Sequence, residues 1–281
     1  MMDKSLKKHP WRAVALYLFV FVVCIVILYP YFVMFTTAAK DRAEMYALDM
    51  TILPKEWHWS NFADIWSAAP VLRYFLNSVI VAGGSTALAI VCGIPAAYAL
   101  SRMKFRGKSF FLGAVIMSQM FAPVVLLVGI YRLMTELGMV DNILGLVLLN
   151  AAFNQAFAIW LLRGTFLTIS PDMEQAAKID GCGTIGALIR VLLPMAAPGI
   201  VTALIFVFIN AWNEYTMALT LMSTDVFKPI TVGINVFYGF NMIQWQYLFA
   251  TSLFATIPVI ILFLFIEKHL AAGLTAGGVK G

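Results

Sequence analysis

Six stretches of this sequence are long enough and apolar enough to cross a lipid bilayer, and they restrict the fold more than any other feature. A membrane-spanning helix needs about 20 predominantly apolar residues. Only 12% of the 281 residues are charged, whereas a soluble domain carries roughly a quarter. The sequence therefore predicts an all-α polytopic membrane protein and excludes a soluble domain, a disordered chain and a nucleic-acid binder. The six spans are expected at residues 13–36, 74–100, 109–131, 142–162, 199–222 and 247–266.

Lysine and arginine are distributed unevenly between the segments that connect these spans. The N-terminus, residues 102–108, residues 163–190 and the C-terminal tail hold 13 of the 19 cations, and the three intervening loops hold six. Cytoplasmic loops carry the excess of positive charge in membrane proteins. The distribution predicts that both termini are cytoplasmic.

The first apolar run has an alternative interpretation as a signal peptide, because four cations precede it. Its 27 uncharged residues, 13–39, exceed the apolar region of a signal peptide, which is about 7–15 residues long. A first membrane span is therefore favoured.

Cysteine and histidine give no indication of a metal site or a disulfide. The three residues of each type are scattered, with no CxxC and no HExxH. We expect no metal and no cofactor in this chain.

The polar segment between the fourth and fifth spans, residues 163–198, has the pattern of a helix, a turn and a second helix. Ser170-Pro171-Asp172 is typical of a helix start, because serine caps the helix, proline suits its first position and an acid favours the positive end of the helix dipole. Gly181-Cys-Gly183 is typical of a helix end followed by a reversal. The small residues at 176, 177 and 181 allow another protein to approach closely. An amphipathic connector lying on the membrane surface is the alternative.

This segment resembles the EAA signature of binding-protein-dependent ABC transporter permeases. Gln175-Ala176-Ala177, Gly181 and the segment 191–194, Val-Leu-Leu-Pro, match its spacing throughout. Gln175 replaces the usual glutamate, and Glu174 lies one position earlier. Residues 52–62, Asn77-Ser78, 212–215 and the tail 273–281 resemble the carbohydrate, maltose-permease-like branch of these permeases.

The resemblance implies the type I ABC importer permease fold in a bacterial inner membrane, with partners that this chain does not encode. These are a second permease subunit, two ABC ATPase subunits and an extracytoplasmic solute-binding protein, in addition to a carbohydrate substrate and membrane lipid. The chain has no GxxxxGK[ST] motif, so ATP and Mg are expected in the ATPase subunits and no catalytic residue is expected here. The residues expected to couple to the ATPases are Glu174, Gln175, Ala176, Ala177, Asp180, Gly181 and Pro194.

An acid inside a predicted span indicates a candidate translocation pathway, because burying a charge in a membrane is costly. Glu214 is such an acid, and at helical spacing it shares a face with Asn210, Asn213 and Met217. Asn154 is a further pathway candidate, and Asn150, Gln155 and Gln119 are weaker ones that could instead join helices to one another. Glu214 could also pair with a neighbouring span or reach the outer surface. The resemblance to the maltose-permease-like branch implies that the outer loop, residues 223–246, reaches the solute-binding protein.

Two other functional classes fit the sequence less well. An ion-coupled secondary transporter needs ionisable residues at mid-membrane and preferably inverted repeats, whereas Glu214 is the single acid in a predicted span and no repeat is evident. An intramembrane enzyme would need a paired nucleophile and base, or a metal cluster, and neither is present in the sequence.

The charge distribution leads to a test of membrane topology. A reporter fused after Gly281 or within residues 102–108 should be cytoplasmic, and one within residues 55–64 should be extracytoplasmic. The opposite result at any of these three places would contradict the arrangement of six spans.

Overall fold

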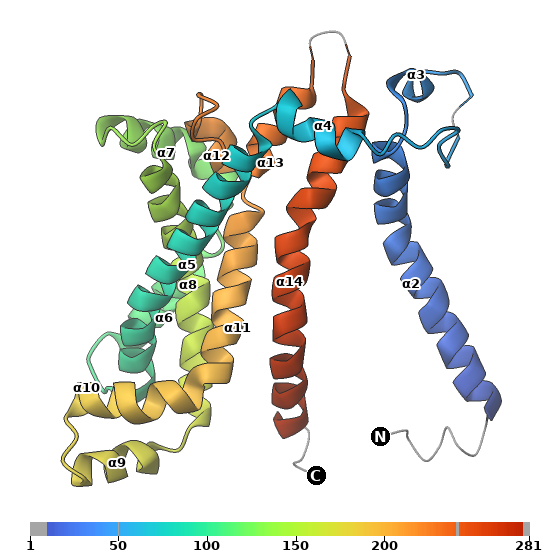
Figure 1. The fold of residues 1–281 in the computed structure, drawn as a ribbon. Helices are drawn as coiled ribbons and strands as arrows, with labels where there is room; N and C mark the ends of the chain where they lie inside the picture. The colour runs from blue at the N-terminus through green and yellow to red at the C-terminus, as the bar shows by residue number, and fades with distance from the viewer. Residues whose placement is uncertain (1–9, 50, 240–241, 278–281) are drawn as a thin grey trace. The chain divides into compact units, whose positions relative to one another are not determined.

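The computed structural model describes residues 10–49, 51–239 and 242–277, and this part of the chain is almost entirely helical. In the described residues the sole β-type pairing is an isolated bridge between Tyr238 and Ile243. The expected all-α fold is confirmed. Figure 1 shows the elements, which are α2 Pro10–Ala38, α3 Arg42–Met45, α4 Asn61–Ala68, α5 Val71–Arg102, α6 Lys108–Ser118, α7 Pro123–Glu136, α8 Ile143–Thr168, α9 Pro171–Ile179, α10 Thr184–Ala187, η1 Leu188–Leu192, α11 Leu193–Trp212, α12 Thr216–Leu221, α13 Ile230–Gly233, η2 Ile234–Phe237 and α14 Trp245–Gly277.

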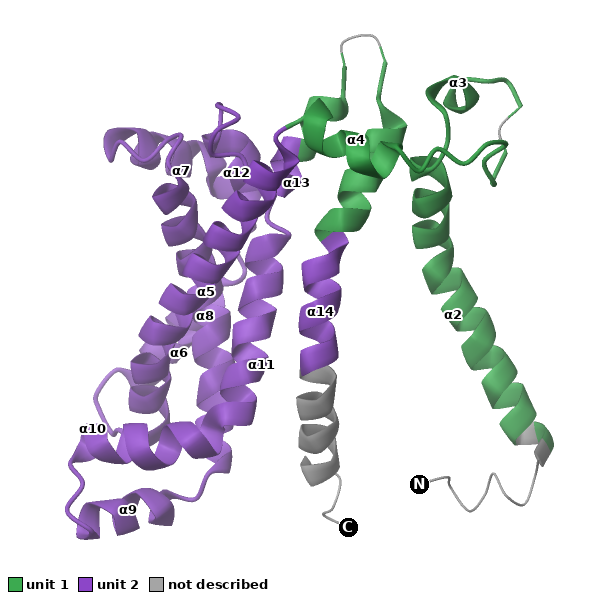
Figure 2. Ribbon diagram, in the orientation of Figure 1, with its two compact units in different colours: residues 1–69, 234–255 green, residues 70–233, 256–281 purple. Residues whose placement is uncertain are grey.

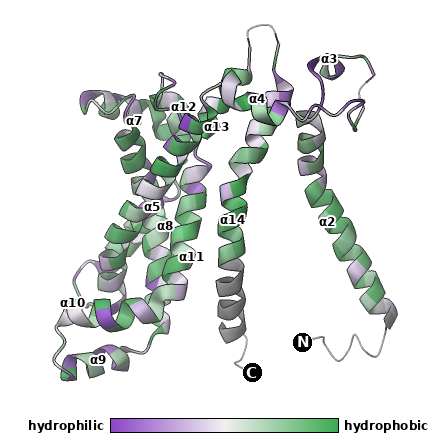
Figure 3. Ribbon diagram, in the orientation of Figure 1, coloured by the Kyte–Doolittle hydropathy of each residue, from purple (hydrophilic) through white to green (hydrophobic). Residues whose placement is uncertain are grey.

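Five of these helices are long and apolar enough to cross a membrane, and the described residues give a sixth span if α6 and α7 are counted together. Figure 3 shows apolar residues along α2, α5, α8 and α11, whereas α3 and α9 are more polar. The predicted spans 13–36, 74–100 and 247–266 lie within α2, α5 and α14, and the predicted span 142–162 lies within α8 except for its first residue, Asn142, which caps that helix. The predicted orientation of the termini stays a prediction, and residues 1–9 and 278–281 lie outside the described part.

The third span is not the continuous helix that we expected over residues 109–131. The helices α6 and α7 meet at an angle of 97° across a short break. Pro123 begins α7, and Ala122 before it is extended, with φ −64° and ψ 126°. A proline restricts the residue before it to extended conformations, and this ends the preceding helical path.

The fifth span also differs from the predicted 199–222. The helix α11 begins at Leu193 and ends at Trp212, and residues 213–215 separate it from α12. Pro194 lies where the π-helical turn η1 continues into α11, and because it has no N–H it removes one helical hydrogen bond from this continuous stretch. Glu214 therefore lies between two helices rather than inside a span.

The chain divides into two compact units that alternate along the sequence. The single transmembrane permease domain that we predict over residues 1–281 stays a prediction. The first unit comprises residues 1–69 and 234–255, and the second comprises residues 70–233 and 256–281 (Figure 2). In the first unit, the Asn61 side-chain amide donates to the carbonyls of Ala38 and Lys40, both at 2.9 Å. These bonds fix the start of α4 to the end of α2.

The core of the second unit lies between α5, α8 and α11. Nearly half of its buried residues are alanines, which allow the helix backbones to approach closely, as is typical of helices packed in membranes. Six alanines belong to this core, namely Ala89, Ala97, Ala151, Ala158, Ala196 and Ala203.

The helix α11 lies close against α8 at Gly199. A Cβ atom on this glycine would overlap the side chain of Thr165 on α8. Both residues lie on long helices that are held by the alanine-rich core, so neither backbone can retreat without disturbing that core.

We expect Gly199→Ala to lower the melting temperature of the purified protein by several degrees, because overpacking a helix contact costs about 1–3 kcal/mol. Thermal unfolding in detergent measures this effect. Gly83→Ala on α5 is the matched control, since a Cβ atom there meets no other atom within 4 Å. Equal melting temperatures for the two variants would contradict the close approach at Gly199.

Candidate functional site

The helix α9 has the capping signals that the sequence indicated at both of its ends. The Ser170 hydroxyl accepts a hydrogen bond from the backbone N–H of Asp172 at 3.3 Å. Pro171 occupies the first helical position. Short helices are marginal unless their terminal N–H and C=O groups are bonded. The start of α9 is therefore defined by local chemistry.

At the other end, Gly181 has a φ of +89°, which favours glycine because it has no Cβ. The N–H of Cys182 bonds the carbonyl of Ala177 at 2.9 Å, and the N–H of Gly181 bonds that of Lys178 at 3.1 Å. These two bonds form a Schellman motif, which ends the helix sharply. The chain then reverses through Gly183 into α10, η1 and α11, as Figure 1 shows.

The buried side chain of Glu174 attaches α9 to the last turn of α5. Its residue is only 6% exposed. The Tyr98 hydroxyl donates to its carboxylate at 2.6 Å, and Lys178 Nζ donates at 2.8 Å. Arg102 Nε lies 3.5 Å from the same carboxylate. We call these four residues the Glu174 cluster.

Arg102 also bonds the segment that joins α8 to α9, and so attaches that segment to the same end of α5. Its guanidinium donates to the carbonyl of Ile169 at 2.7 Å, directly before the cap of α9. The end of α5 therefore holds both the entry to α9 and the middle of α9.

Burial alone would raise the pKa of the Glu174 carboxyl, and it is the largest single influence. Hydrogen bonds from Lys178 and Tyr98, together with the charges of Lys178 and Arg102, outweigh it and hold the pKa below its ordinary value of 4.5. A depressed pKa in the folded state means that the cluster stabilises the fold above pH 4.5. This contribution is lost as the pH falls through the depressed pKa.

The predicted coupling residues separate into two groups on α9. Glu174 and Ala177 face inward, and Ala177 is only 7% exposed, so we were wrong to place Ala177 on a surface open to a partner. The opposite face is exposed and carries Ile179, which is 86% exposed. Ile179 was not among the predicted coupling residues. The exposed residues of the predicted set are Gln175 and Ala176 on α9, Asp180 and Gly181 directly after it, and Pro194 on α11.

The predicted pathway face around Glu214 does not exist as a face of one helix, because α11 ends before it. The Glu214 carboxylate accepts hydrogen bonds from the N–H groups of Met217 at 2.6 Å and Ala218 at 3.0 Å. It therefore caps α12. Met217 is buried in a hydrophobic core, whereas Asn210 and Asn213 are exposed.

The amide candidates on α8 are bonded within their own helix. Asn154 donates to the carbonyl of Asn150 at 2.8 Å, and Asn150 donates to that of Leu146 at 3.0 Å. Both asparagines are buried. A direct role of Asn154 in the pathway stays a prediction.

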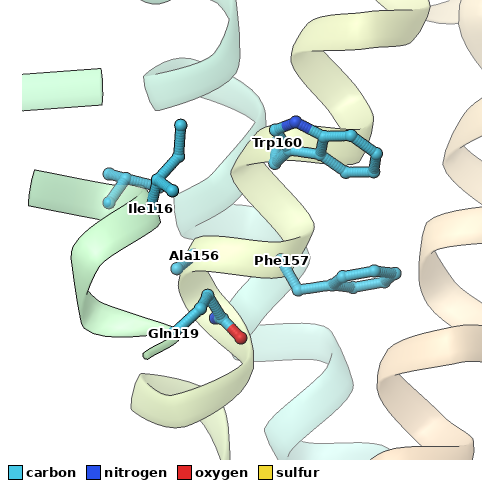
Figure 4. Close-up of a pocket in the computed structure, with 6 residues that line it drawn as sticks. Ile116, Gln119, Ala156, Phe157 and Trp160 are labelled. Carbon is cyan, nitrogen blue, oxygen red and sulfur yellow. The ribbon is translucent and has the colours of Figure 1, made fainter. Parts of the chain in front are cut away.

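Gln119, a weaker pathway candidate, borders an apolar pocket of about 190 Å³ between the end of α6 and α8. Its side-chain amide donates to the carbonyl of Phe153 at 3.4 Å. Figure 4 shows the side chains of Ile116, Phe157 and Trp160 around the same pocket. We did not predict these three residues from the sequence, because apolar side chains in a membrane span give no signal of their own.

The partners of Glu174 were likewise absent from the sequence analysis. The sequence analysis used Arg102 only as one of the positive charges that predict membrane topology. Tyr98 lies in an apolar run, 76 positions before Glu174. A contact over this separation leaves no local pattern.

Comparisons with known proteins agree on one kind of molecule. Residues 89–275 match the family described as binding-protein-dependent transport system inner membrane component. The chain is 34% identical to the probable ABC transporter permease protein YurM of Bacillus subtilis, covering 99% of this chain and 92% of that protein. It is also 34% identical to the sulfoquinovosyl glycerol transport system permease protein SmoH of Agrobacterium fabrum, covering 90% of this chain and 89% of that protein.

A similar fold occurs in the crystal structure of a bacterial ABC transporter that imports the acidic polysaccharide alginate. The TM-score is 0.79 at 21% sequence identity, covering 95% of this chain and 98% of that chain. At this identity the similarity supports the fold alone.

The Glu174 cluster leads to a prediction about how firmly α9 is held against α5. We expect Glu174→Gln to accelerate hydrogen exchange of the α9 amides by about tenfold or more, because it leaves Lys178 and Arg102 without their counter-charge. Mass spectrometry of exchanged peptides measures this. Gln175→Ala, which removes an exposed neighbour outside the cluster, is the control. Unchanged exchange in Glu174→Gln would show that the cluster does not hold α9.

Proposed function

The chain belongs to the family of binding-protein-dependent transport system inner membrane components, and from this premise we propose that it is a permease subunit of an ATP-driven carbohydrate importer. The observation that carries the proposal is α9, a short helix that is capped at both ends, attached to α5 by a buried ion pair and exposed on its opposite face. In this proposal α9 is the contact for the ATPase subunits.

A contact that transmits movement must be rigid, because a flexible loop would absorb the displacement. The caps of α9 fix its length, and the Glu174 cluster fixes its position on α5. A displacement imposed on α9 by closure of two ATPases would therefore reach α5 directly. The continuous path from α10 through η1 offers a second route into α11.

The exposed face of α9 is suited to a partner with an apolar socket. Ile179 and Met173 project from it, and Ile185 is exposed on α10. Gln175 occupies the place of the usual glutamate of the family signature and can still donate and accept hydrogen bonds without adding charge. In the contact that we propose, Ile179 and Met173 supply the apolar part, and Gln175 and Asp180 supply the polar part.

The partners and ligands follow from the same proposal. ATP and Mg bind to separate ATPase subunits, since this chain has no phosphate-binding loop of the GxxxxGK[ST] type. A second permease subunit completes the pathway, and an extracytoplasmic binding protein delivers the substrate. We place α9 and both termini on the cytoplasmic side, as the cation distribution predicts.

A carbohydrate is the proposed substrate class because of the relatives. The named substrate of one relative is a glycoside, sulfoquinovosyl glycerol, and a transporter of the same fold imports a polysaccharide. The aromatic rings of Phe157 and Trp160 and the amide of Gln119 are groups that bind sugars in general, by stacking and by hydrogen bonding. Family membership gives no support to an ion-coupled secondary transporter.

Reconstitution tests the proposed function. Proteoliposomes that hold this chain, its companion permease and the ATPases should take up the ligand of the companion binding protein only when ATP and that binding protein are both present. Uptake driven by an ion gradient without ATP would overturn the proposal.

The docking surface gives a sharper prediction. We expect Ile179→Asp to reduce co-purification of the ATPase by about tenfold or more, because it buries an unpaired charge in an apolar contact. Gly181→Val should also weaken the association, since the φ of +89° disfavours a β-branched residue and moves the end of α9. Leu137→Asp is the control, because Leu137 is exposed after α7, at the other end of α8 from α9. Normal ATPase binding by Ile179→Asp would place the docking surface elsewhere.

A further inference from the structure

The segment between α12 and α13, residues 223–233, is fixed to the first turns of α5 by two buried polar side chains. The Asn77 amide donates to the carbonyls of Val226 at 2.9 Å and Lys228 at 3.0 Å. The Ser78 hydroxyl accepts from the backbone N–H of Ile230 at 2.8 Å. Asn77 is 8% exposed and Ser78 only 2%. Buried bonds of this kind hold a loop far more firmly than bonds that compete with water.

A third side chain holds the start of the same segment. Asp141, in the turn between α7 and α8, has a φ of 52°. Its carboxylate accepts from the N–H groups of Ser223 at 2.6 Å and Thr224 at 3.0 Å, and its own N–H donates to the carbonyl of Leu221 at 3.0 Å. The first eleven residues of the outer loop 223–246 are thus bonded to the helices at several points. Residues 240–241 of that loop lie outside the described part of the structure.

The two ends of α5 are therefore built alike. Asn77 and Ser78 at its start hold the 223–233 segment, and Tyr98 and Arg102 at its end hold α9. Ser78 and Tyr98 are 20 residues apart, which is about 30 Å along a helix. Figure 1 shows α9 and the α12–α13 region at opposite ends of α5.

Between these two attachments, α5 is supported along its length. Ala89 and Ala97 are fully buried in the core that α5 forms with α8 and α11. Pro95 removes one helical hydrogen bond, yet α5 continues without a break to Arg102. A helix supported in this way moves as one body, so a displacement at one end appears at the other.

We propose that α5 mechanically connects the 223–233 segment to α9, and that Asn77 and Ser78 are positioning residues that make this connection. The inference rests on the proposed function, in which ATPases bind α9 and the solute-binding protein binds the opposite side of the membrane. The exposed residues Ser223, Thr224, Asp225 and Val226 then form the surface that the binding protein touches. The side chains that make the two attachments are held in place by burial, since Asn77, Ser78, Tyr98 and Glu174 are each less than 10% exposed.

The experiment measures ATP hydrolysis by the whole reconstituted complex, with and without the ligand-loaded binding protein. We expect Asn77→Ala to reduce the stimulation by about two- to thirtyfold, the range by which positions between coupled sites modulate coupling. Ser78→Ala, which deletes a single oxygen atom, should act in the same direction with a smaller effect. It keeps the proposal testable if Asn77→Ala does not assemble. Basal hydrolysis and co-purification of the ATPase should be unchanged in both.

Thr86→Val on α5 is the matched control, because Thr86 is also buried but its hydroxyl bonds the carbonyl of Ala82 in the same helix. It should keep full stimulation. Full stimulation in both Asn77→Ala and Ser78→Ala would overturn the proposed connection. A wild-type complex that shows no stimulation at all would instead refute the proposed function, so the two failures are distinguishable.

A double variant tests whether the two ends of α5 belong to one path. If they do, Asn77→Ala combined with Tyr98→Phe should reduce the stimulation no further than the more severe single variant. If the reduction in the double variant equals the product of the reductions in the two single variants, the two ends act independently, and the proposal is overturned.

Discussion

The close packing of α5 against α8 and α11 is the constraint on which the remaining features of the second unit depend. Alanines and the glycine at 199 bring these helices together, and such contacts replace the hydrophobic driving force that is missing between helices in lipid. Packing of this density does not deform gradually, because each side chain already touches its neighbours. The three helices therefore provide a rigid frame for the polar attachments at their ends.

Polar side chains are concentrated where this frame meets the connecting segments. The Glu174 cluster holds α9, and Asn77, Ser78 and Asp141 hold residues 223–233. Each of these attachments is bonded to partners that remove the cost of burying a polar group. In an importer whose ATPases and binding protein lie on opposite sides of a membrane, rigid attachments at both ends of the same helices are what mechanical coupling requires.

The sequence predicted those features that depend on residues close to one another along the chain. The apolar runs predicted α2, α5, α8 and α14, and the order Ser170, Pro171 and later Gly181 predicted α9 and its end. The break between α6 and α7 was missed, although Pro123 could have indicated it. The predicted pathway face around Glu214 was wrong for a related reason. Residues at helical spacing share a face only if the helix continues through them, and α11 ends at Trp212.

What the sequence determined by itself was the helical class, four of the span positions and the capped helix α9, because hydropathy and capping act over a few residues. The tertiary structure alone decided that Glu174 faces Tyr98 and Arg102, that Ala177 is buried and that Glu214 caps α12. It also decided that Asn77 bonds a segment about 150 positions away. Such contacts depend on how distant helices pack, and a single sequence carries no local pattern for the partner of a buried polar group.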